Sequence, residues 1–483
     1  MIVPVNSHTN IAGNPYTIAQ SPDRKGERAS VQEDSFRFSP TDLTPEGNLK
    51  LIVQTSDQQL LARLMHECVD CGKVTGLLSL ISGFSAEISP AAYQNIFSKV
   101  SDRVSVTLDG EVLVPKPEEL ASNNGESSQP AKLDVALPTL GVDKLHQKGI
   151  KGKGITWAVI DTGINASHPD LEGQVIGWKD FIEATDSPVD PQGHGTHVGS
   201  TIDGTGKASD GKFVGVAPEA KLVGVRVLDA DGSGSFSDVI KGIQWVVEHK
   251  DEFGIRGFNM SLGGTSFSSY KNDPVAQAVE KAVAAGLVAE IAAGNSGPSQ
   301  GTVSTPGIAP SAKTIGALDD KGTVDRSDDG VARFSGTGPT KVDKLQKPDL
   351  LFPGVKITAA LSPGSALDSP DIPHVGDKYI TISGTSMATP YGSGVSILML
   401  SVNPDLTPQQ VKEIKTRTAE KLADVDVTRQ GFGVGMPEKA VAEAEALLPP
   451  APPAPEPPVE PQPPPPPPSQ GEPGEPPEWL VAA

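Results

Sequence analysis

The sequence predicts an α/β fold with a mostly parallel central sheet, preceded by a small α+β domain of the ferredoxin-like kind. From about residue 135 to 447, continuous apolar stretches alternate with helical segments, and the clearest are "ITWAVI", "KLVGVRVL", "GFNMSL" and "GLVAEIAA". Strands that are apolar on both faces are typical of parallel sheets covered by helices on both sides. In residues 49–114 the order of elements is β-α-β-β-α-β, which is that of ferredoxin-like domains.

The elements of the small domain follow from local patterns. "KLIVQ" at residues 50–54 and the later segments "VTGLLSLIS" and "FSAEIS" are strand-like, whereas "DQQLLARLMHECV" has the apolar spacing of a helix. Ser89 and Pro90 mark the start of a second helix, because serine favours the N-cap and proline the first turn. "RVSVTLDGEVLV" at 103–114 is expected to close the domain as one strand.

Composition sets three segments apart from the two predicted domains, 49–114 and 135–447. Residues 1–48 form a polar extension without periodicity, and residues 115–134 read as a linker. Residues 448–483 are proline-rich, which predicts an extended polyproline II tail. This tail is either a spacer or a ligand for an SH3-type partner.

The charge balance limits the classes of partner. The chain of 483 residues carries a net charge of −20, which argues against nucleic acid or an anionic membrane surface, since both favour a basic face. No run approaches 18 apolar residues, so no membrane span is expected. The start "MIVPVNSHTN" lacks the basic and apolar regions of a signal peptide. A cytoplasmic location is therefore favoured over secretion, unless the start codon is misassigned.

The two cysteines, Cys68 and Cys71, exclude a disulfide-rich scaffold. A zinc site would need two further ligands, and no Cys or His partner lies at finger spacing in the sequence. A redox pair and two incidental thiols remain as alternatives.

Three short motifs combine an acid, a base and a nucleophile. Asp161 follows an apolar strand in "WAVIDTG", His194 lies in "GHGTHV", and Ser386 begins an apolar helix in "ISGTSMATP". Serine needs a base to act as a nucleophile, and the base needs an acid that fixes its tautomer. The free N–H groups at a helix start suit an oxyanion beside the serine. Each motif alone could be structural, but the three together predict nucleophilic catalysis.

The segment "QGHGTHVG" contains two histidines, His194 and His197, and spacing alone does not say which of them acts. They could form a metal pair, or a base beside a structural neighbour. A metal pair lacks both the glutamate of an H-E-x-x-H motif and a third ligand.

These motifs resemble the subtilisin-like serine proteases, the subtilases, whose catalytic residues occur in the order Asp, His, Ser. The resemblance covers roughly residues 133–447 and includes "VIDTGINASHPDL", "GHGTHVGS", "NMSLGG", "AAGNSG" and "GTSMATP". It implies a subtilisin-like three-layer fold and a triad of Asp161, His194 and Ser386. Asn295 is then the side-chain donor to the oxyanion, His197 a structural residue, and no cofactor is needed for the chemistry.

The resemblance also implies how the protease is made. Residues 49–114 resemble the subtilase pro-domain, an intramolecular inhibitor and folding aid whose tail enters the active site. We therefore expect a zymogen that cuts itself within residues 115–134. The expected partners are polypeptide substrates and the chain's own pro-domain.

The substrate groove is likewise implied by family position. Two edge segments, "GSGSF" and "SLGG", are expected to flank an extended peptide, and small residues to form the S1 walls. Since no charged residue belongs to this set, broad specificity with large apolar P1 residues such as Leu, Phe or Tyr is expected. The candidate substrate-binding residues are Gly232, Ser233, Gly234, Phe236, Ser261, Leu262, Gly263, Ala292, Ala293 and Gly294.

Several residues depart from the family pattern or fit it weakly. Asp170 matches a calcium-ligand position of some subtilases, but the usual calcium loop is not recognisable, so a local capping role is the alternative. Tyr391 and Gly392 stand where the family usually has His, and altered packing is expected there. Glu290 interrupts an otherwise apolar strand and needs a cation or a raised pKa.

Two other functions compete for the same residues. A subtilase-like binding protein without activity would be expected to have lost a member of the set formed by Asp161, His194, Ser386 and Asn295, yet all four are present. An esterase or lipase lacks support because the serine lies in "GTSMA" and not in G-x-S-x-G.

Overall fold

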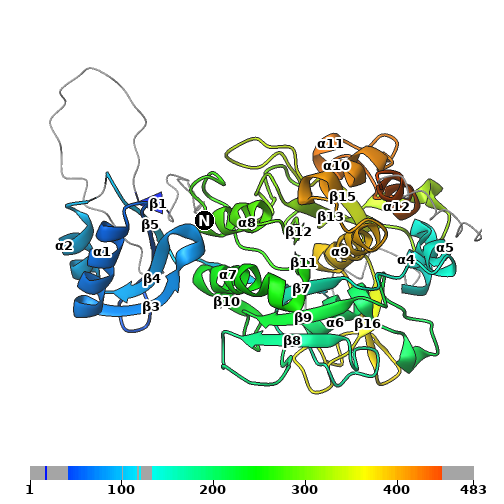
Figure 1. Ribbon diagram of the computed structural model, residues 1–483, viewed down its shortest axis with the longest axis horizontal. Coiled ribbons are helices and arrows are strands. Elements are labelled where there is room, and N and C mark those ends of the chain that lie inside the picture. The colour runs from blue at the N-terminus through cyan, green and yellow to red at the C-terminus, as the bar shows by residue number, and fades with distance from the viewer. Residues whose placement is uncertain (1–16, 19–41, 101, 117–118, 121–132, 449–483) are drawn as a thin grey trace, which may run out of the picture. The chain divides into compact units, whose positions relative to one another are not determined.

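The computed structural model describes five stretches of the chain, shown in colour in Figure 1: residues 17–18, 42–100, 102–116, 119–120 and 133–448. Most of the predicted N-terminal extension, most of the linker and all but the first residue of the proline-rich tail lie outside them. In the described parts, no helix combines the length and the apolar composition that crossing a lipid bilayer requires.

The large α/β region is built on an eight-stranded sheet. The strand order is β14-β13-β12-β11-β7-β9-β8, with β15 also pairing with β13. All pairs are parallel except β13 with β14, which confirms the predicted mostly parallel sheet. The strands are β7 (Thr156–Asp161), β8 (Val175–Asp180), β9 (Lys221–Arg226), β11 (Ile255–Met260), β12 (Val288–Ala292), β13 (Lys313–Asp319), β14 (Gly330–Val331) and β15 (Leu350–Pro353).

Helices cover both faces of this sheet, so that successive residues of one strand enter different apolar layers. On β7, Trp157 and Val159 join the cluster that contains α6 and α9, whereas Ala158 and Ile160 join the cluster beneath α7 and α8. This two-sided burial is why the strands are apolar throughout. The helices are α4 (Leu133–Leu140), α5 (Val142–Gln147), α6 (His194–Asp203), α7 (Phe236–Phe253), α8 (Pro274–Ala284), α9 (Thr385–Val402), α10 (Pro408–Thr418), α11 (Val427–Gln430) and α12 (Pro437–Ala446).

Two small sheets complete this region. In the first, β16 (Ile357–Ala360), β18 (Tyr379–Ile382) and β17 (His374–Val375) pair antiparallel in the order β16-β18-β17. The second joins β10 (Ser233–Ser235) to β6 (Glu111–Leu113).

The small N-terminal region has the predicted β-α-β-β-α-β order, and α1 and α2 lie on one face of its antiparallel sheet (Figure 1). Its strand order is β1-β5-β2-β4-β3. Cys68 is buried and Cys71 exposed, both are free thiols, and burial raises the pKa of Cys68 to about 12. The elements are β1 (Thr17–Ile18), β2 (Leu49–Gln54), α1 (Gln58–Cys71), β3 (Gly72–Leu78), β4 (Gly83–Ile88), α2 (Pro90–Phe97) and β5 (Ser105–Leu108).

Two strand predictions were wrong in detail. The strand-like segment 74–82 ends at Leu78 and continues as a short 3-10 helix. The single strand expected at 103–114 is divided into β5 and β6, and β6 leaves the small sheet to pair with β10. The break falls at Asp109 and Gly110, where Asp109 accepts a hydrogen bond from the backbone of Ser237 at 2.8 Å. A Cβ on Gly110 would lie 2.8 Å from the ring of Phe236, so the chain passes too closely for a side chain.

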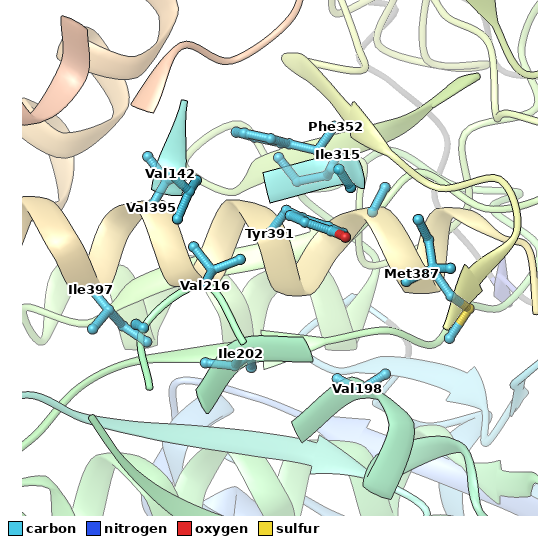
Figure 2. Packing of buried hydrophobic residues seen from close by; sticks show 14 of the residues in the cluster. Val142, Val198, Ile202, Val216, Ile315, Phe352, Met387, Tyr391, Val395 and Ile397 are labelled. Atoms are coloured by element: carbon cyan, nitrogen blue, oxygen red, sulfur yellow. The ribbon is translucent and has the colours of Figure 1, made fainter. Parts of the chain in front are cut away.

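The core of the large region is organised around α9. Every residue from 385 to 400 is buried, so this helix needs apolar neighbours on all sides. Figure 2 shows Met387, Tyr391 and Ile397 leaving the helix in different directions into the apolar cluster. Tyr391 thus takes part in core packing, as expected for this departure from the family pattern.

Glu290 has the cation that the sequence did not identify. Lys415 of α10 lies 2.8 Å from Glu290 Oε1, and Ser396 of α9 donates to the same oxygen at 2.7 Å. Burial lowers the pKa of Lys415, an effect that the negative charge of Glu290 opposes. Gly392 leaves room for this carboxylate, because a Cβ there would lie 2.8 Å from Glu290 Oε2.

We expect Lys415→Met to lower the free energy of unfolding by about 3–5 kcal/mol, because it leaves the carboxylate of Glu290 buried and unpaired. Urea denaturation of the Ser386→Ala protein, which cannot digest itself if Ser386 is the nucleophile, measures this loss. Arg417→Met is the matched control, since Arg417 lies on the same helix in an exposed ion pair with Glu443 and should matter little. Adding Glu290→Leu to Lys415→Met should restore part of the loss. Equal effects of the two single changes would contradict the interpretation.

Candidate functional site

Asp161 and His194 are joined by a short hydrogen bond inside the protein. Asp161 is the last residue of β7 and His194 the first of α6, and both side chains are fully buried. His194 Nδ1 lies 2.8 Å from Asp161 Oδ1, and the backbone N–H of Thr162 donates to the same oxygen. His194 Nε2 has no hydrogen-bond partner among the described residues. The ring is therefore held through one nitrogen while the other remains available.

Glycines bring these two segments together. A Cβ on Gly195 would lie 2.0 Å from the carbonyl oxygen of Gly163, so only glycine allows α6 to start this close to the end of β7. Gly193, just before His194, has φ 102°, a left-handed conformation that side chains disfavour. The two glycines beside His194 thus fix where the imidazole lies.

Ser386 is the second residue of α9 and is tied to Ser261 in two ways. Its hydroxyl donates to the carbonyl oxygen of Ser261 at 2.8 Å, and the hydroxyl of Ser261 donates to the carbonyl oxygen of Ser386 at 2.9 Å. The second bond replaces one that the helix cannot form, since Pro390, four residues on, has no N–H. The hydroxyl of Ser386 is thus turned toward Ser261 in this structure.

Asn295 follows β12 and meets the same helix start. Its Oδ1 accepts hydrogen bonds from the backbone N–H of Thr385 at 2.8 Å and from the hydroxyl of Thr385 at 3.0 Å. With the oxygen so occupied, the amide nitrogen Nδ2 is left to donate. A Cβ on Gly384 would lie 3.5 Å from Nδ2, so this donor lies beside the segment that carries Ser386.

Ser386 and Asn295 line one cavity of about 650 Å³. Of the predicted substrate-binding residues, Phe236, Ser261, Leu262, Gly263, Ala292 and Gly294 line it as well. Ala293 is fully buried and does not, whereas Gly232, Ser233 and Gly234 lie along the tail of the small domain. The lining residues that were not predicted include Asp231, Thr265, Ser266, Thr302, Val303, Ser304 and Lys341.

The tail of the small domain, Glu111–Lys116, forms part of the wall of this cavity and lies between two edges of the large region. On one side β6 pairs antiparallel with β10, and Val114 donates its N–H to the carbonyl oxygen of Gly232 at 3.0 Å. On the other side Leu113 and Gly263 exchange two backbone hydrogen bonds of 3.0 and 3.1 Å. The side chains of Val112 and Val114 are buried, and that of Leu113 is exposed. An extended peptide is thus bound mainly through its backbone.

Comparison with known proteins agrees with this architecture. The sequence profile of the subtilase family matches residues 152–435. The chain is 40% identical over 377 residues to "Serine protease AprX" of Bacillus subtilis (strain 168), covering 76% of this chain and 81% of that protein. It belongs to the subtilase family. It is accordingly a serine-type endopeptidase with the predicted subtilisin-like fold.

Further relatives cover the same region. Subtilisin DY of Bacillus licheniformis is 34% identical over 290 residues, which are 60% of this chain and 92% of that protein. The crystal structure of fervidolysin from Fervidobacterium pennivorans, a keratinolytic enzyme related to subtilisin, superposes with a TM-score of 0.63 at 25% identity. The match covers 84% of this subtilase and 62% of fervidolysin.

Asp170 of this subtilase does not fit a calcium site. Its two carboxylate oxygens accept hydrogen bonds of 2.8 Å, one from the hydroxyl of Tyr379 and one from the backbone N–H of Ala208. Calcium needs six to eight oxygen ligands, and the described residues contain no group of three or more His, Cys, Asp or Glu side chains that could hold a metal. The geometry is that of the alternative, a carboxylate that caps local structure.

His197 differs from His194 in its surroundings. It is fully buried in α6, and its Nε2 lies 3.1 Å from the carbonyl oxygen of Ile357. Burial lowers the pKa of His197 to about 3. The imidazole is therefore neutral at ordinary pH and links α6 to β16.

The depressed pKa of His197 predicts a pH dependence of stability. Between about pH 6.5 and 3 the unfolded chain binds a proton at this residue and the folded one does not. Each unit by which the pH is lowered in this range therefore reduces the free energy of unfolding by up to about 1.4 kcal/mol. The His197→Gln variant lacks this slope. The measurement is urea denaturation of two proteins in the Ser386→Ala background, one with His197 and one with His197→Gln. The free energy of unfolding of the first minus that of the second should be higher at pH 8 than at pH 5. A difference that does not change with pH would contradict the assignment.

Proposed function

We propose that this subtilase hydrolyses peptide bonds through Asp161, His194 and Ser386. The observation that carries the proposal is the 2.8 Å bond between buried Asp161 and His194, whose other nitrogen is unpartnered among the described residues. The helix that His194 begins, α6, packs against α9, which carries Ser386. For attack, the Ser386 hydroxyl rotates from Ser261 to His194 Nε2, which accepts its proton. The serine oxygen then bonds to the peptide carbon, and His194 returns the proton to the leaving amine. Water hydrolyses the acyl-enzyme by the same proton transfers in reverse.

Each neighbour of the reacting atoms has a separate role in this proposal. Asp161 holds the imidazole in one tautomer and stabilises its charged form. The developing oxyanion receives hydrogen bonds from Asn295 Nδ2 and from the backbone N–H of Ser386 at the start of α9. Support for the Asn295 role is that its oxygen is already held by Thr385, which fixes the direction of the amide nitrogen.

Replacing Asn295 should lower kcat with little change in KM, because its amide acts on the transition state. We expect Asn295→Leu to reduce kcat about 10²–10³-fold, a range that rests partly on subtilisin itself. Asn295→Asp is the matched control: it keeps an acceptor for Thr385 but loses the donor, so kcat should fall there too. Full activity of the Asp variant would show that Asn295 only caps α9. A rise in KM without a fall in kcat would show that Asn295 does not stabilise the transition state.

We further propose broad specificity with large apolar P1 residues. Support comes from the small walls Ser261–Gly263 and Ala292–Gly294, with Ser304 between them. A Cβ on Gly263 or Gly294 would lie 2.5 or 2.7 Å from Ser304 Oγ, so both glycines lie too close to Ser304 for a side chain. The charged side chains of Asp231 and Lys341 also line the cavity.

A peptide library that varies only the P1 residue tests this specificity. Leu, Phe or Tyr should give the highest kcat/KM, because their apolar area is buried against the walls Ser261–Gly263 and Ala292–Gly294, which contain no charged residue. A profile dominated by Arg and Lys, or by Asp and Glu, would show that Asp231 or Lys341 governs P1 instead.

Finally, we propose that residues 49–114 act as an intramolecular pro-domain of a zymogen and that the chain cuts itself within residues 115–134. Support comes from the tail Glu111–Lys116, which occupies the groove that a substrate would need. While it is there, a second peptide cannot pair with Gly263 or β10.

A further inference from the structure

The tail in the groove presents a proline opposite Ser261, the residue whose carbonyl oxygen accepts a hydrogen bond from the hydroxyl of Ser386. Leu113 faces Gly263 in an antiparallel bridge, so the register places Pro115 opposite Ser261. Because hydrogen-bonded and non-bonded pairs alternate in antiparallel strands, position 115 should exchange hydrogen bonds with Ser261 as Leu113 does with Gly263. Proline has no N–H, so the bond from residue 115 to the carbonyl oxygen of Ser261 cannot form.

The Ser261 carbonyl oxygen, which cannot receive a hydrogen bond from Pro115, receives one from the hydroxyl of Ser386. Ser386 Oγ donates to the Ser261 carbonyl oxygen at 2.8 Å, and His194 Nε2 has no partner among the described residues. The hydroxyl therefore does not share its proton with the base while the tail is bound. An ordinary residue at position 115 would compete for the Ser261 oxygen and favour rotation of the hydroxyl toward His194.

The chain also turns just beyond this proline. The carbonyl oxygen of Lys116 accepts hydrogen bonds from the N–H groups of Glu119 and Leu120, both at 3.0 Å, which closes a turn. Leu120 is fully buried in the apolar cluster around α9. The peptide bond after Pro115 is thus held between the extended tail and an anchored turn.

We propose that Pro115 makes the tail an inhibitor that binds but is not cut. Proline lacks the backbone N–H that would displace the Ser386 hydroxyl from the Ser261 carbonyl oxygen. The activating cut therefore falls beyond Lys116. This inference rests on the proposed serine protease function and specifies how the same site is regulated. It narrows the processing region from 115–134 to the residues after Lys116.

The test follows processing of the full-length chain by gel and by N-terminal sequencing, with Pro115→Ala as the informative variant. Wild type should yield no chain that begins at Lys116. Pro115→Ala should yield that new N-terminus, and its precursor should disappear about fivefold faster or more, roughly the effect of one added backbone hydrogen bond. Lys116→Ala is the matched control, because it changes the other side of the same peptide bond but keeps the proline, and it should behave as wild type.

The outcomes separate this inference from the function on which it rests. A wild-type chain beginning at Lys116, or a Pro115→Ala chain that is neither cut after residue 115 nor processed faster, would overturn the role of Pro115 alone. If Ser386→Ala is trimmed as readily as wild type, self-processing itself is wrong and the inference falls with it. Pro115→Ala in the Ser386→Ala background should unfold at a urea concentration no lower than Ser386→Ala itself, which excludes misfolding as the cause of faster cutting.

Discussion

The burial of α9 is the constraint on which the rest of the structure depends. A helix with sixteen consecutive buried residues has no solvent-facing side, so it is stable only where strands and helices enclose it. Strands β11, β12, β13 and β15 lie along it, and α6 and α12 pack against it. Because Ser386 is at its start, the packing of the whole core fixes the position of the serine that we propose as the nucleophile.

Burying α9 on all sides also buries polar groups, which need hydrogen-bond partners. Pro390 leaves the carbonyl oxygen of Ser386 without its helical donor, and the hydroxyl of Ser261 supplies one. Ser261 is itself held by Asn259, which accepts a hydrogen bond from Ser393, so the chain of contacts returns to α9. The buried pair of Glu290 and Lys415 secures the same helix further along through Ser396. Buried polar groups are thus paired wherever α9 needs an anchor.

The site combines a rigid half with an adjustable one. Asp161, His194 and Asn295 are fixed by backbone or side-chain partners that do not depend on a bound peptide. The Ser386 hydroxyl, in contrast, needs only a rotation about one bond to change its acceptor. In the proposed mechanism, a peptide in the groove therefore decides whether this hydroxyl meets His194, and the tail acts without any movement of the core.

Local patterns determined much of this protein from the sequence alone. Two-sided apolar strands predicted the parallel sheet, and the spacing before residue 114 predicted the small α+β region. The motifs around Asp161, His194 and Ser386 predicted a triad, of which Asp161 and His194 are joined by a hydrogen bond. The sequence could not show that β6 leaves its own sheet or that Lys415 pairs with Glu290, since both contacts join segments more than 100 residues apart. Nor could it distinguish His194 from His197 by spacing, because one buried imidazole gains a carboxylate and the other a carbonyl only when distant strands close around α6. Local patterns such as apolar periodicity can be read from neighbouring residues in the sequence. The hydrogen-bond and ion-pair partners of a side chain, and its burial, depend on packing between distant segments, so only the tertiary structure decided them.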